Sequence, residues 1–257
     1  MINSKDSNNT FYVLNERKGI PIVFIHGVGL NNKIWEPQIK AFENTVLTYD
    51  ILGHGKTPLN KSKITFDDFS EQLLNLINEL KFEKIHLVGF SIGSLIARNF
   101  ASKFNSRLKT LILLCSVFER NEHQQQIVND RYELSKKSKS LSRQALKRWF
   151  SEDYINKNPD IYEKICSILE KNNMENFLKV YELFVKHKDN ENFENINIKT
   201  LIMTGENDIG STPEMSKNLS RKISNSKVKI ISKGKHLCSI ECVDDVNNTI
   251  KQFIKNG

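Results

Sequence analysis

Short apolar runs alternate along the chain with longer segments in which apolar residues recur every three or four positions. The short runs are typical of strands buried on both faces, and the longer segments of helices with one buried face. This pattern predicts strands at residues 11–15, 20–27, 44–50, 84–90, 108–116, 198–206 and 227–232, and helices at 33–42, 65–81, 92–104 and 243–255. We expect Thr65 or Asp67 to cap the second helix. The alternation predicts an α/β fold with a mainly parallel sheet covered by helices on both faces.

The alternation stops between residues 118 and 195, where the chain is polar and helix-like and has no strand-like run. An all-helical block between two strands of one sheet predicts an insertion that covers one end of that sheet. We therefore expect an α/β core formed by residues 1–117 and 196–257, with a helical cap at 118–195. A chain of 257 residues is long enough for one such domain with an insertion.

Basic residues outnumber acidic ones, which gives a formal net charge of +8 at pH 7. They are spread along the chain and belong to no recognisable nucleic-acid module, so we expect a solvated basic surface and no nucleic-acid partner. The first ten residues are polar, and no apolar run approaches the roughly 20 residues that a membrane span needs. The expectation is a soluble, cytoplasmic protein without a membrane partner.

The chain has four cysteines, which are scattered and do not suggest a disulfide framework. One segment, HLCSIEC, brings His236, Cys238 and Cys242 close together in sequence. A zinc site would need further spaced cysteine or histidine pairs elsewhere in the chain. We therefore expect free thiols and no bound metal.

The segment LVGFSIGSLIARNF at residues 87–100 places Ser91 between Gly89 and Gly93, after a predicted strand and before a predicted helix. A nucleophile elbow requires this strand–turn–helix setting and small residues beside the serine. The turn would aim the hydroxyl at a helix N-terminus, where backbone N–H groups favour negative charge. The alternative is a structural serine in a βα turn. The choice depends on whether the chain also supplies the partners that a nucleophile needs.

A serine nucleophile needs a base, and an acid must orient that base. The candidate bases are His26, His54, His86, His123, His187 and His236. When the nucleophile lies on an elbow of this kind, the acid and then the histidine follow it along the chain. Only His236 lies late enough, in the loop between the last predicted strand and the last predicted helix.

The acid should follow a strand that lies between Ser91 and His236 in sequence. Asp208, in LIMTGENDIGSTP, meets this condition, and Glu206 is the second candidate. Asp208 could instead cap the helix that begins near Pro213 or form an Asx-turn. Three residues at the carboxyl ends of three strands, in the required order, favour catalysis, and we predict that Ser91 is a nucleophile.

The intermediate of such a reaction carries an oxyanion that needs hydrogen-bond donors. We expect one donor to be the backbone N–H of Ile92, which follows the nucleophile. The second is expected from the loop HGVGLNN, where the N–H of Val28 is the main candidate. We expect His26 to hold that loop in place and not to transfer protons.

With these residues in place, the chain resembles the α/β-hydrolase superfamily. The likeness runs through IVFIHGVGLNNKIWEPQI, YDILGHGKT, LVGFSIGSLIAR, TLIMTGENDIGSTP and KHLCSIECVDDV, which span almost the whole chain. The chain is most similar to 3-oxoadipate enol-lactonases and small esterases, through HGVGLNNKIWEPQ, RWFSEDYINKNPDIYEKI and the spacing from His236 to Glu241. It departs from many relatives at Ser94, where they have glycine, and in lacking a proline after Glu241.

The resemblance implies that Ser91 is the nucleophile, Asp208 the acid and His236 the base, with Val28 and Ile92 as oxyanion donors. It argues against haloalkane dehalogenases and epoxide hydrolases, which have aspartate at the nucleophile position, and against proline iminopeptidases, which have an HGGPG-type loop. Carbon–carbon bond hydrolases usually have tryptophan soon after the histidine, where this chain has LCSIE.

We therefore predict a serine hydrolase that cleaves a small carboxylic ester or lactone, 3-oxoadipate enol-lactone among them, without metal or organic cofactor. The pocket is expected to be lined from the cap by Trp149, Phe150, Phe177 and Tyr181. The basic cap residues Arg143, Lys147 and Arg148 are expected to form a solvated face rather than to receive a carboxylated substrate. The alternatives are carbon–carbon bond hydrolysis, acyl transfer or perhydrolysis on the same residues, and a non-catalytic ligand-binding protein of the same fold.

Overall fold

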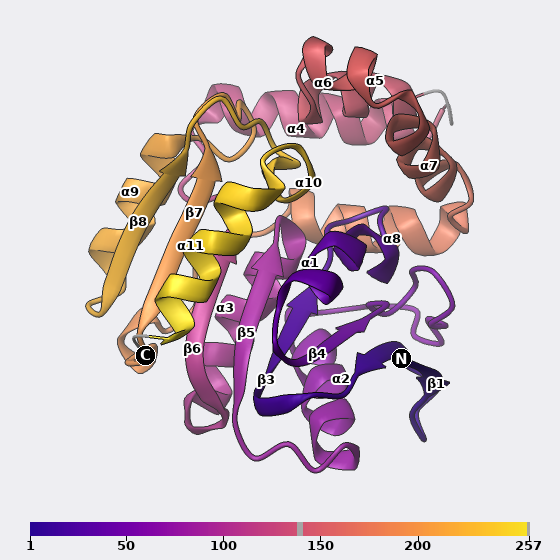
Figure 1. Cartoon of the computed structure of the whole chain (residues 1–257). Helices are drawn as coiled ribbons and strands as arrows, with labels where there is room; N and C mark the ends of the chain where they lie inside the picture. The colour runs from indigo at the N-terminus through magenta and orange to yellow at the C-terminus, as the bar shows by residue number, and fades with distance from the viewer. Residues whose placement is uncertain (138–140, 256–257) are drawn as a thin grey trace.

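One twisted sheet forms the centre of the molecule (Figure 1). The computed structural model describes residues 1–137 and 141–255. The strands are β1 (Ile2–Lys5), β2 (Phe11–Asn15), β3 (Lys18–Ile25), β4 (Asn44–Tyr49), β5 (Ile85–Phe90), β6 (Leu108–Leu114), β7 (Thr200–Gly205) and β8 (Ser226–Ile231). Within this part of the chain they form an eight-stranded sheet in the order β1-β2-β4-β3-β5-β6-β7-β8. The β1–β2 and β2–β4 pairs are antiparallel, and the other neighbouring pairs are parallel.

The predicted fold class is confirmed, and each predicted strand is present. Strand β1 was not predicted, because its sequence INSK is polar and its side chains are mostly exposed. It joins the sheet through its backbone, with Ile2 opposite Leu14 and Lys5 opposite Phe11. Hydrophobic patterning reports burial, so it does not detect an edge strand of this kind.

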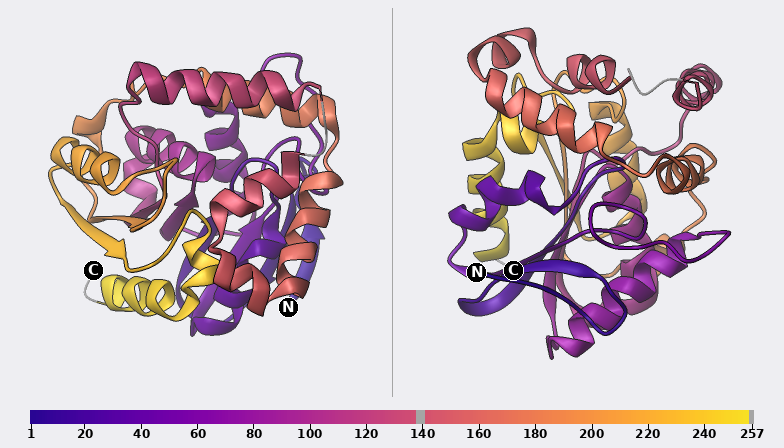
Figure 2. Two further views of the ribbon diagram at one scale, coloured as in Figure 1. Left: turned by 90° about the horizontal axis from the view of Figure 1, so that it is seen from above. Right: turned by 90° about the vertical axis from the view of Figure 1, so that its right-hand side faces the viewer.

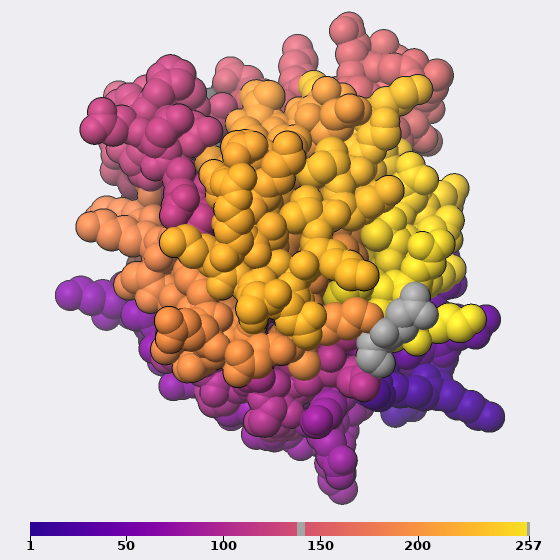
Figure 3. All heavy atoms as spheres, turned by 90° about the vertical axis from the view of Figure 1, so that its left-hand side faces the viewer, coloured from indigo at the N-terminus to yellow at the C-terminus, as the bar shows by residue number. Residues whose placement is uncertain are grey.

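Helices cover both faces of the sheet and bury two apolar clusters against it. They are α1 (Glu36–Ala41), α2 (Phe66–Glu79), α3 (Ile92–Phe104), α9 (Pro213–Lys222), α10 (Cys238–Glu241) and α11 (Val243–Lys255). Helices α2, α3 and α9 contribute to the cluster on one face, and α1 and α11 to the cluster on the other. In Figure 3 the C-terminal part of the chain, from α9 to α11, covers the β8 side of the molecule.

Local sequence explains where two of these helices begin. Thr65 is the N-cap of α2, and it exchanges hydrogen bonds with Asp68 in a capping box. The other predicted cap, Asp67, pairs with Lys103 of α3 at 2.7 Å. The helix predicted at 33–42 begins as a 3-10 turn at Asn32–Trp35 and becomes α-helical at α1, whose first turn contains a proline, where no backbone donor is needed.

Between β6 and β7, the described residues form five α-helices. They are α4 (Glu122–Ser135), α5 (Leu141–Trp149), α6 (Glu152–Lys157), α7 (Pro159–Glu170) and α8 (Met174–Val185), and we call Glu122–Val185 the helical insert. Figures 1 and 2 show the insert across the ends of the strands at which β5 and β7 finish. Residues 138–140 of the predicted cap lie outside the described residues.

Among the helices in the described part of the chain, none combines the length and the apolar character that crossing a membrane requires.

Candidate active site

Ser91 lies in a tight turn between β5 and α3, as predicted. Its backbone φ is +55° and its ψ is −119°, a conformation that residues with a side chain rarely adopt. The N–H of Ser91 donates to the carbonyl oxygen of Leu114 on β6 at 2.9 Å, which ties the turn to the neighbouring strand. Strained backbone of this kind persists only where surrounding contacts enforce it, and it concentrates at functional sites.

The two glycines that flank Ser91 are required by close backbone contacts. A Cβ atom on Gly89 would overlap the carbonyl of Gly93, and one on Gly93 would lie 2.5 Å from the carbonyl oxygen of Ile25 and 2.7 Å from that of His26. These neighbours are backbone atoms of packed elements and cannot move aside cheaply. The two glycines of GFSIG thus leave the room that the turn requires, as the sequence predicted.

Asp208 follows β7 and is almost fully buried. Its Oδ1 accepts the N–H groups of Gly210 at 2.8 Å and Ser211 at 3.0 Å, which makes an Asx-type turn. Its Oδ2 accepts a hydrogen bond from Nδ1 of His236 at 2.7 Å. The turn therefore fixes the carboxylate in the direction of the imidazole, and Thr212 caps α9 in its place.

Glu206, the second candidate acid, is exposed and has a different partner. Its carboxylate accepts the backbone N–H of Lys233 at 2.9 Å. The structure thus separates the two acids that the sequence left open, and it places Asp208 beside the histidine.

His236 lies in the loop after β8, with its ring against Phe90 and Trp149 at centroid distances of 5.0 and 5.8 Å. Burial disfavours the charged imidazolium, but the charge and hydrogen bond of Asp208 more than offset this and raise the pKa of His236 to about 10. The pKa of Asp208 is lowered, because the imidazolium and the two backbone donors outweigh the effect of burial. Since Nδ1 faces the carboxylate, Nε2 is the nitrogen left for another partner.

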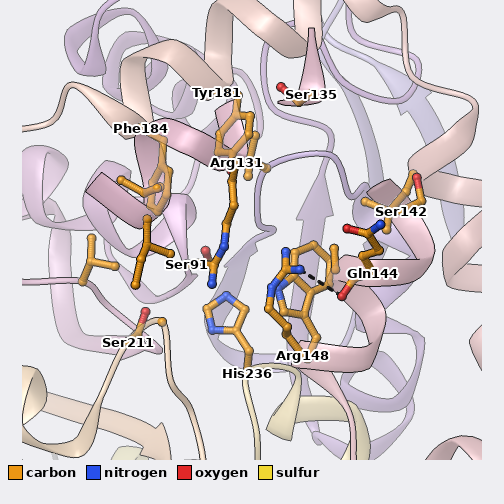
Figure 4. A pocket seen from close by; sticks show the side chains of 18 of the residues that line it. Ser91, Arg131, Ser135, Ser142, Gln144, Arg148, Tyr181, Phe184, Ser211 and His236 are labelled. Atoms are coloured by element: carbon orange, nitrogen blue, oxygen red, sulfur yellow. Dashed lines mark hydrogen bonds between the residues drawn. The ribbon is translucent and has the colours of Figure 1, made fainter. Parts of the chain in front are cut away.

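A cavity of about 340 Å³ opens above these residues, between the strand ends and the helical insert. Its volume is typical of a site for a small ligand. Figure 4 shows Ser91 and His236 at the inner wall. The predicted residues that line it are Val28, Ser91, Trp149, Phe177, Tyr181, Asp208 and His236.

The sequence also predicted Phe150 in the pocket lining, and the structure places it elsewhere. Its side chain is fully buried in the apolar cluster beneath α5 and stacks on Tyr154 at a centroid distance of 5.1 Å. Phe150 directly follows α5, and its N–H still donates to the carbonyl oxygen of Leu146 at 2.9 Å, as in a helix. Since successive residues in helical geometry point about 100° apart, Trp149 faces the cavity while Phe150 faces the protein interior.

The loop after β3 is held by two buried histidines. Nε2 of His26 accepts the N–H of Ile51 at 3.1 Å, and Nε2 of His54 accepts the N–H of Gly29 at 2.8 Å. Burial lowers the pKa of His26 to about 4 and that of His54 to about 3, so both rings are neutral acceptors near pH 7. The structure thus gives His26 the loop-holding position that the sequence predicted.

The two predicted oxyanion donors occupy suitable elements. Val28 lies on the loop after β3 and lines the cavity with Ser91. Ile92 is the first residue of α3, where backbone N–H groups have no acceptor within the helix. The N–H of Gly29 is taken by His54, which leaves Val28 as the nearer candidate on this loop.

Three neighbouring residues escaped the sequence analysis. Thr204 donates to the carbonyl oxygen of Ser211 at 2.6 Å and so closes the turn that holds Asp208. Cys115, whose φ is +52°, donates its thiol to the carbonyl oxygen of His236 at 3.2 Å. Arg131 of α4 lines the cavity. No sequence pattern assigned a role at the site to any of the three, and only the tertiary structure shows their contacts.

Two groups in the described part have the spacing of metal ligands. One comprises Cys115, Asp208 and His236, and the other His187, Asp189 and Glu191. In the first, Asp208 and His236 already bind each other, and burial raises the pKa of the Cys115 thiol well above its usual value. The second is occupied by the guanidinium of Arg98, which donates to both carboxylates at 2.7 Å. In the described structure, His236, Cys238 and Cys242 do not form such a group.

The sequence was compared with family models and with known proteins. A model described as alpha/beta hydrolase fold matches residues 20–241. The (E)-2-((N-methylformamido)methylene)succinate hydrolase of Acinetobacter baylyi is 26% identical and is aligned over 97% of this chain and 95% of its own length. The 3-oxoadipate enol-lactonase 2 of the same organism is 22% identical over 91% of this chain and 88% of its own.

The structure was compared with solved structures in the same way. The enol-lactonase from Burkholderia xenovorans LB400 superposes with a TM-score of 0.88 and 21% sequence identity, and the match covers 96% of this chain and 98% of that one. At this level of identity the likeness concerns the fold. It extends to the helical insert, because the coverage is nearly complete on both sides.

Proposed function

The chain belongs to the α/β-hydrolase fold family, and from this premise we propose that it is a serine hydrolase that cleaves a small carboxylic ester or lactone through an acyl-enzyme on Ser91. The relation between Asp208 and His236 carries the proposal. A buried carboxylate, fixed by two backbone donors, holds Nδ1 of the imidazole at 2.7 Å beside a serine in a strained elbow. A purely structural role for these three residues requires neither the strain nor the shared cavity.

The mechanism follows from the side of the imidazole that Asp208 occupies. Because Nδ1–H donates to the carboxylate, Nε2 is free to take the proton of Ser91 as Oγ attacks the substrate carbonyl. The same proton then passes to the leaving alkoxide, and the acyl group remains on Ser91. Water attacks the acyl carbonyl, gives its proton to His236, and releases the acid and the free serine.

The oxyanion formed in both steps is assigned to the backbone N–H groups of Val28 and Ile92. Donors fixed before the reaction stabilise charge as it develops and cost no reorganisation at that moment. In this proposal the helical insert acts as a cap that shapes the acyl site and excludes bulk water. The reaction needs neither a metal nor an organic cofactor.

The lactone class is supported by the name of one relative, a 3-oxoadipate enol-lactonase. Another is named a hydrolase of a substituted succinate, and that name contains an amide and two carboxylates but no ester or lactone bond. The cavity of about 340 Å³ suits substrates of that size. A small ester or lactone, 3-oxoadipate enol-lactone among them, is therefore our preferred substrate type.

Labelling with a fluorophosphonate probe tests the nucleophile directly. We expect labelling of the folded protein, a modified peptide that contains Ser91, and hydrolysis of short p-nitrophenyl esters and lactones. Ser91→Ala should abolish labelling and turnover while the unfolding curve stays close to that of the wild type. Retained turnover in this variant would exclude Ser91 as the nucleophile.

The outcomes also separate the alternatives. A folded protein that neither labels nor hydrolyses any ester would favour a non-catalytic ligand-binding role. Labelling with faster product formation in the presence of hydrogen peroxide or an alcohol would assign the acyl group to another acceptor. Labelling with turnover only of carbon–carbon bonded diketones would replace the ester by that substrate class.

A further inference from the structure

Three arginines from the helical insert and its entry segment line the cavity above Ser91. They are Arg120, Arg131 of α4 and Arg148 of α5. In Figure 4 the side chains of Arg131 and Arg148 reach from their helices into the cavity, toward His236. Much of the remaining wall is apolar, with Phe177 and Phe184 among its residues.

None of these three cations forms an ion pair with a carboxylate in the described part of the chain, although the charge of Asp189 acts on Arg120. Arg148 donates to the backbone carbonyl of Gln144 at 3.0 Å, and Arg131 makes no hydrogen bond or ion pair among the described residues. The acidic residues of the lining are Glu170 and Asp208, and Asp208 is already engaged by His236. Other arginines of the chain do form ion pairs with carboxylates.

One such arginine is Arg143, which lies five residues before Arg148 on the same helix. It points to the surface and forms two hydrogen bonds with Glu163, at 2.7 and 3.0 Å. The sequence analysis treated Arg143, Lys147 and Arg148 together as a solvated face. That interpretation holds for the exposed Arg143 and Lys147 and is wrong for Arg148, which faces the cavity.

The third arginine is also left with unused donors. Arg120 donates to the carbonyl oxygens of Phe184 and Val185, at 3.2 and 3.4 Å, and its Nη2 is buried without a partner in the described structure. The Arg120 guanidinium also lies over the Phe184 ring, 4.5 Å from its centroid, and the charge of Asp189 acts on it. Arg120 therefore adds positive charge beside the cavity, while its buried Nη2 is out of reach of a ligand.

The positive charges are close enough to affect one another. Burial lowers the pKa of Arg148, and the charge of Arg131 lowers it further. Burial raises the pKa of Tyr181, while Arg131, Arg148 and Arg120 all oppose that rise. The Tyr181 ring of α8 thus lies where all three cations act. Like charges held together in a partly buried site repel each other unless an anion lies between them.

The position of Arg131 on its own helix supports the same conclusion. Ile127, Val128 and Leu134 lie three or four residues from it, on the same face of α4, and all of them line the cavity. Gln124 and Ser135 of the same face line it too, so Arg131 lies among apolar and polar lining residues and is directed into the pocket.

We propose that the substrate carries a free carboxylate in addition to its scissile ester or lactone bond, and that Arg131 and Arg148 bind this carboxylate from opposite sides. The inference rests on the proposed function and names the substrate class of that same site. Guanidinium groups offer paired N–H donors that match a carboxylate, and the apolar wall strengthens the interaction by excluding water. Arg120 and Tyr181 complete the positive end of the cavity.

A matched pair of esters tests the inference. The p-nitrophenyl monoester of glutaric acid and p-nitrophenyl pentanoate have acyl chains of equal length and differ in whether a carboxylate or a methyl group ends the chain. We expect kcat/KM to favour the carboxylate by about 10- to 100-fold, which corresponds to one or two charge-assisted hydrogen bonds. The preference should weaken as salt concentration rises.

Variants then assign the preference to residues. Arg131→Gln and Arg148→Gln should each lower the ratio of kcat/KM for the glutarate monoester to that for pentanoate by about tenfold. An unfolding curve close to that of the wild type shows that each variant is folded. Arg143→Gln, which removes the same charge from the surface of α5, should change neither substrate.

Two results would overturn the inference without touching the proposed function. One is equal hydrolysis of the two esters by the wild type, and the other is an equal loss on both esters in the arginine variants. Absence of both turnover and fluorophosphonate labelling would instead remove the proposed function. Glutarate binding is a separate readout, since it should raise the Tm of Ser91→Ala and not that of Ser91→Ala/Arg131→Gln/Arg148→Gln.

Discussion

The hydroxyl of Ser94 donates a 2.5 Å hydrogen bond to the carbonyl oxygen of Ser91, which also accepts the N–H of Ser94 at 2.9 Å. Ser94 is fully buried on the first turn of α3. It stands where many similar hydrolases have glycine, so this chain adds a side-chain contact to the strained elbow. That contact holds the backbone of the candidate nucleophile.

Ser94→Ala should therefore lower both stability and turnover. Loss of one buried hydrogen bond should reduce the free energy of unfolding by about 1 kcal/mol, since the backbone donor remains. We expect kcat to fall several-fold, because the elbow can relax, while KM for a neutral ester stays nearly constant. Urea unfolding and steady-state kinetics measure the two effects.

Ser102→Ala is the matched control for that variant. Ser102 lies on the same helix and donates to the carbonyl oxygen of Asn99 at 2.9 Å, three residues earlier, away from the elbow. It should cost a similar or smaller free energy of unfolding and leave kcat unchanged. A parallel loss of kcat in both variants would mean that Ser94 acts only through global stability.

The second prediction concerns pH. Asp208 raises the pKa of His236 above its ordinary 6.5, so the imidazole stays protonated, and unable to act as a base, to higher pH than usual. In the free enzyme kcat/KM should therefore rise with pH, with a midpoint above 6.5, and fall away on the acid side. The pH profile for p-nitrophenyl pentanoate measures this midpoint.

NMR titration of Ser91→Ala assigns the midpoint to a ring. The His236 signals should titrate above pH 6.5, whereas His26 and His54, whose pKa values burial lowers to about 4 and 3, should stay neutral across the activity range. Asp208→Asn should lower the His236 pKa and reduce kcat by roughly 10³- to 10⁴-fold, because the tautomer and orientation are lost. An acid limb below pH 6 in the wild type would contradict the assignment.

The sequence predicted those parts of the protein that depend on local sequence patterns. The predicted strands carried apolar runs or apolar–polar alternation, and Ser91 was flanked by glycines between a strand and a helix. Strand β1 escaped because backbone hydrogen bonds hold it, with polar side chains. The predicted partners Asp208 and His236 are 28 residues apart, and only their place after parallel strands indicated that they would meet.

The cavity wall was harder to predict, because the direction of each helix in the insert depends on tertiary packing. Trp149 and Phe150 are adjacent aromatic residues, and sequence alone could not decide which of them faces the pocket. Arg131 has apolar residues three and four positions away, but polar residues on the same face, Gln124 and Ser135, also line the cavity, so the pattern gave only a weak signal. The sequence around Arg148 gave no such signal. Only the tertiary structure shows that Arg148 faces the cavity while Arg143, on the same helix, pairs with Glu163 at the surface.

The third prediction concerns Arg98, which joins α3 to the segment after the helical insert. Its guanidinium is fully buried and donates to Asp189 and Glu191, both at 2.7 Å. Arg98→Met would leave two carboxylates in the interior without their cation, so the free energy of unfolding should fall by about 3–5 kcal/mol. Denaturant unfolding measures the loss, and Arg143→Gln, which breaks an exposed ion pair, should cost less than about 1 kcal/mol.

The same cluster predicts a dependence of stability on pH. Burial alone would raise the pKa of Asp189, but the hydrogen bond from His187 and the charge of Arg98 hold it well below its usual value. A lowered pKa contributes stability above the unfolded value of about 3.9, and that stability is lost as pH falls toward the folded pKa. The loss of stability below about pH 4 should therefore be smaller in Arg98→Met than in the wild type. Equal acid sensitivity of the two proteins would exclude this source.

The last prediction separates two neighbouring aromatic residues, Trp149 at the end of α5 and Phe150 directly after it. Trp149→Ala should enlarge the acyl end of the cavity, because the indole lies 5.8 Å from the ring of His236, so the best p-nitrophenyl ester should become longer by one or more carbons. Its backbone carbonyl still accepts the N–H of Leu237, at 3.0 Å, so the loop that carries His236 keeps its anchor. Phe150→Ala leaves a cavity in the core and should cost about 3–5 kcal/mol of unfolding free energy without changing the preferred chain length. If Phe150→Ala shifted the chain-length preference and Trp149→Ala did not, the orientation of α5 over the site would be wrong.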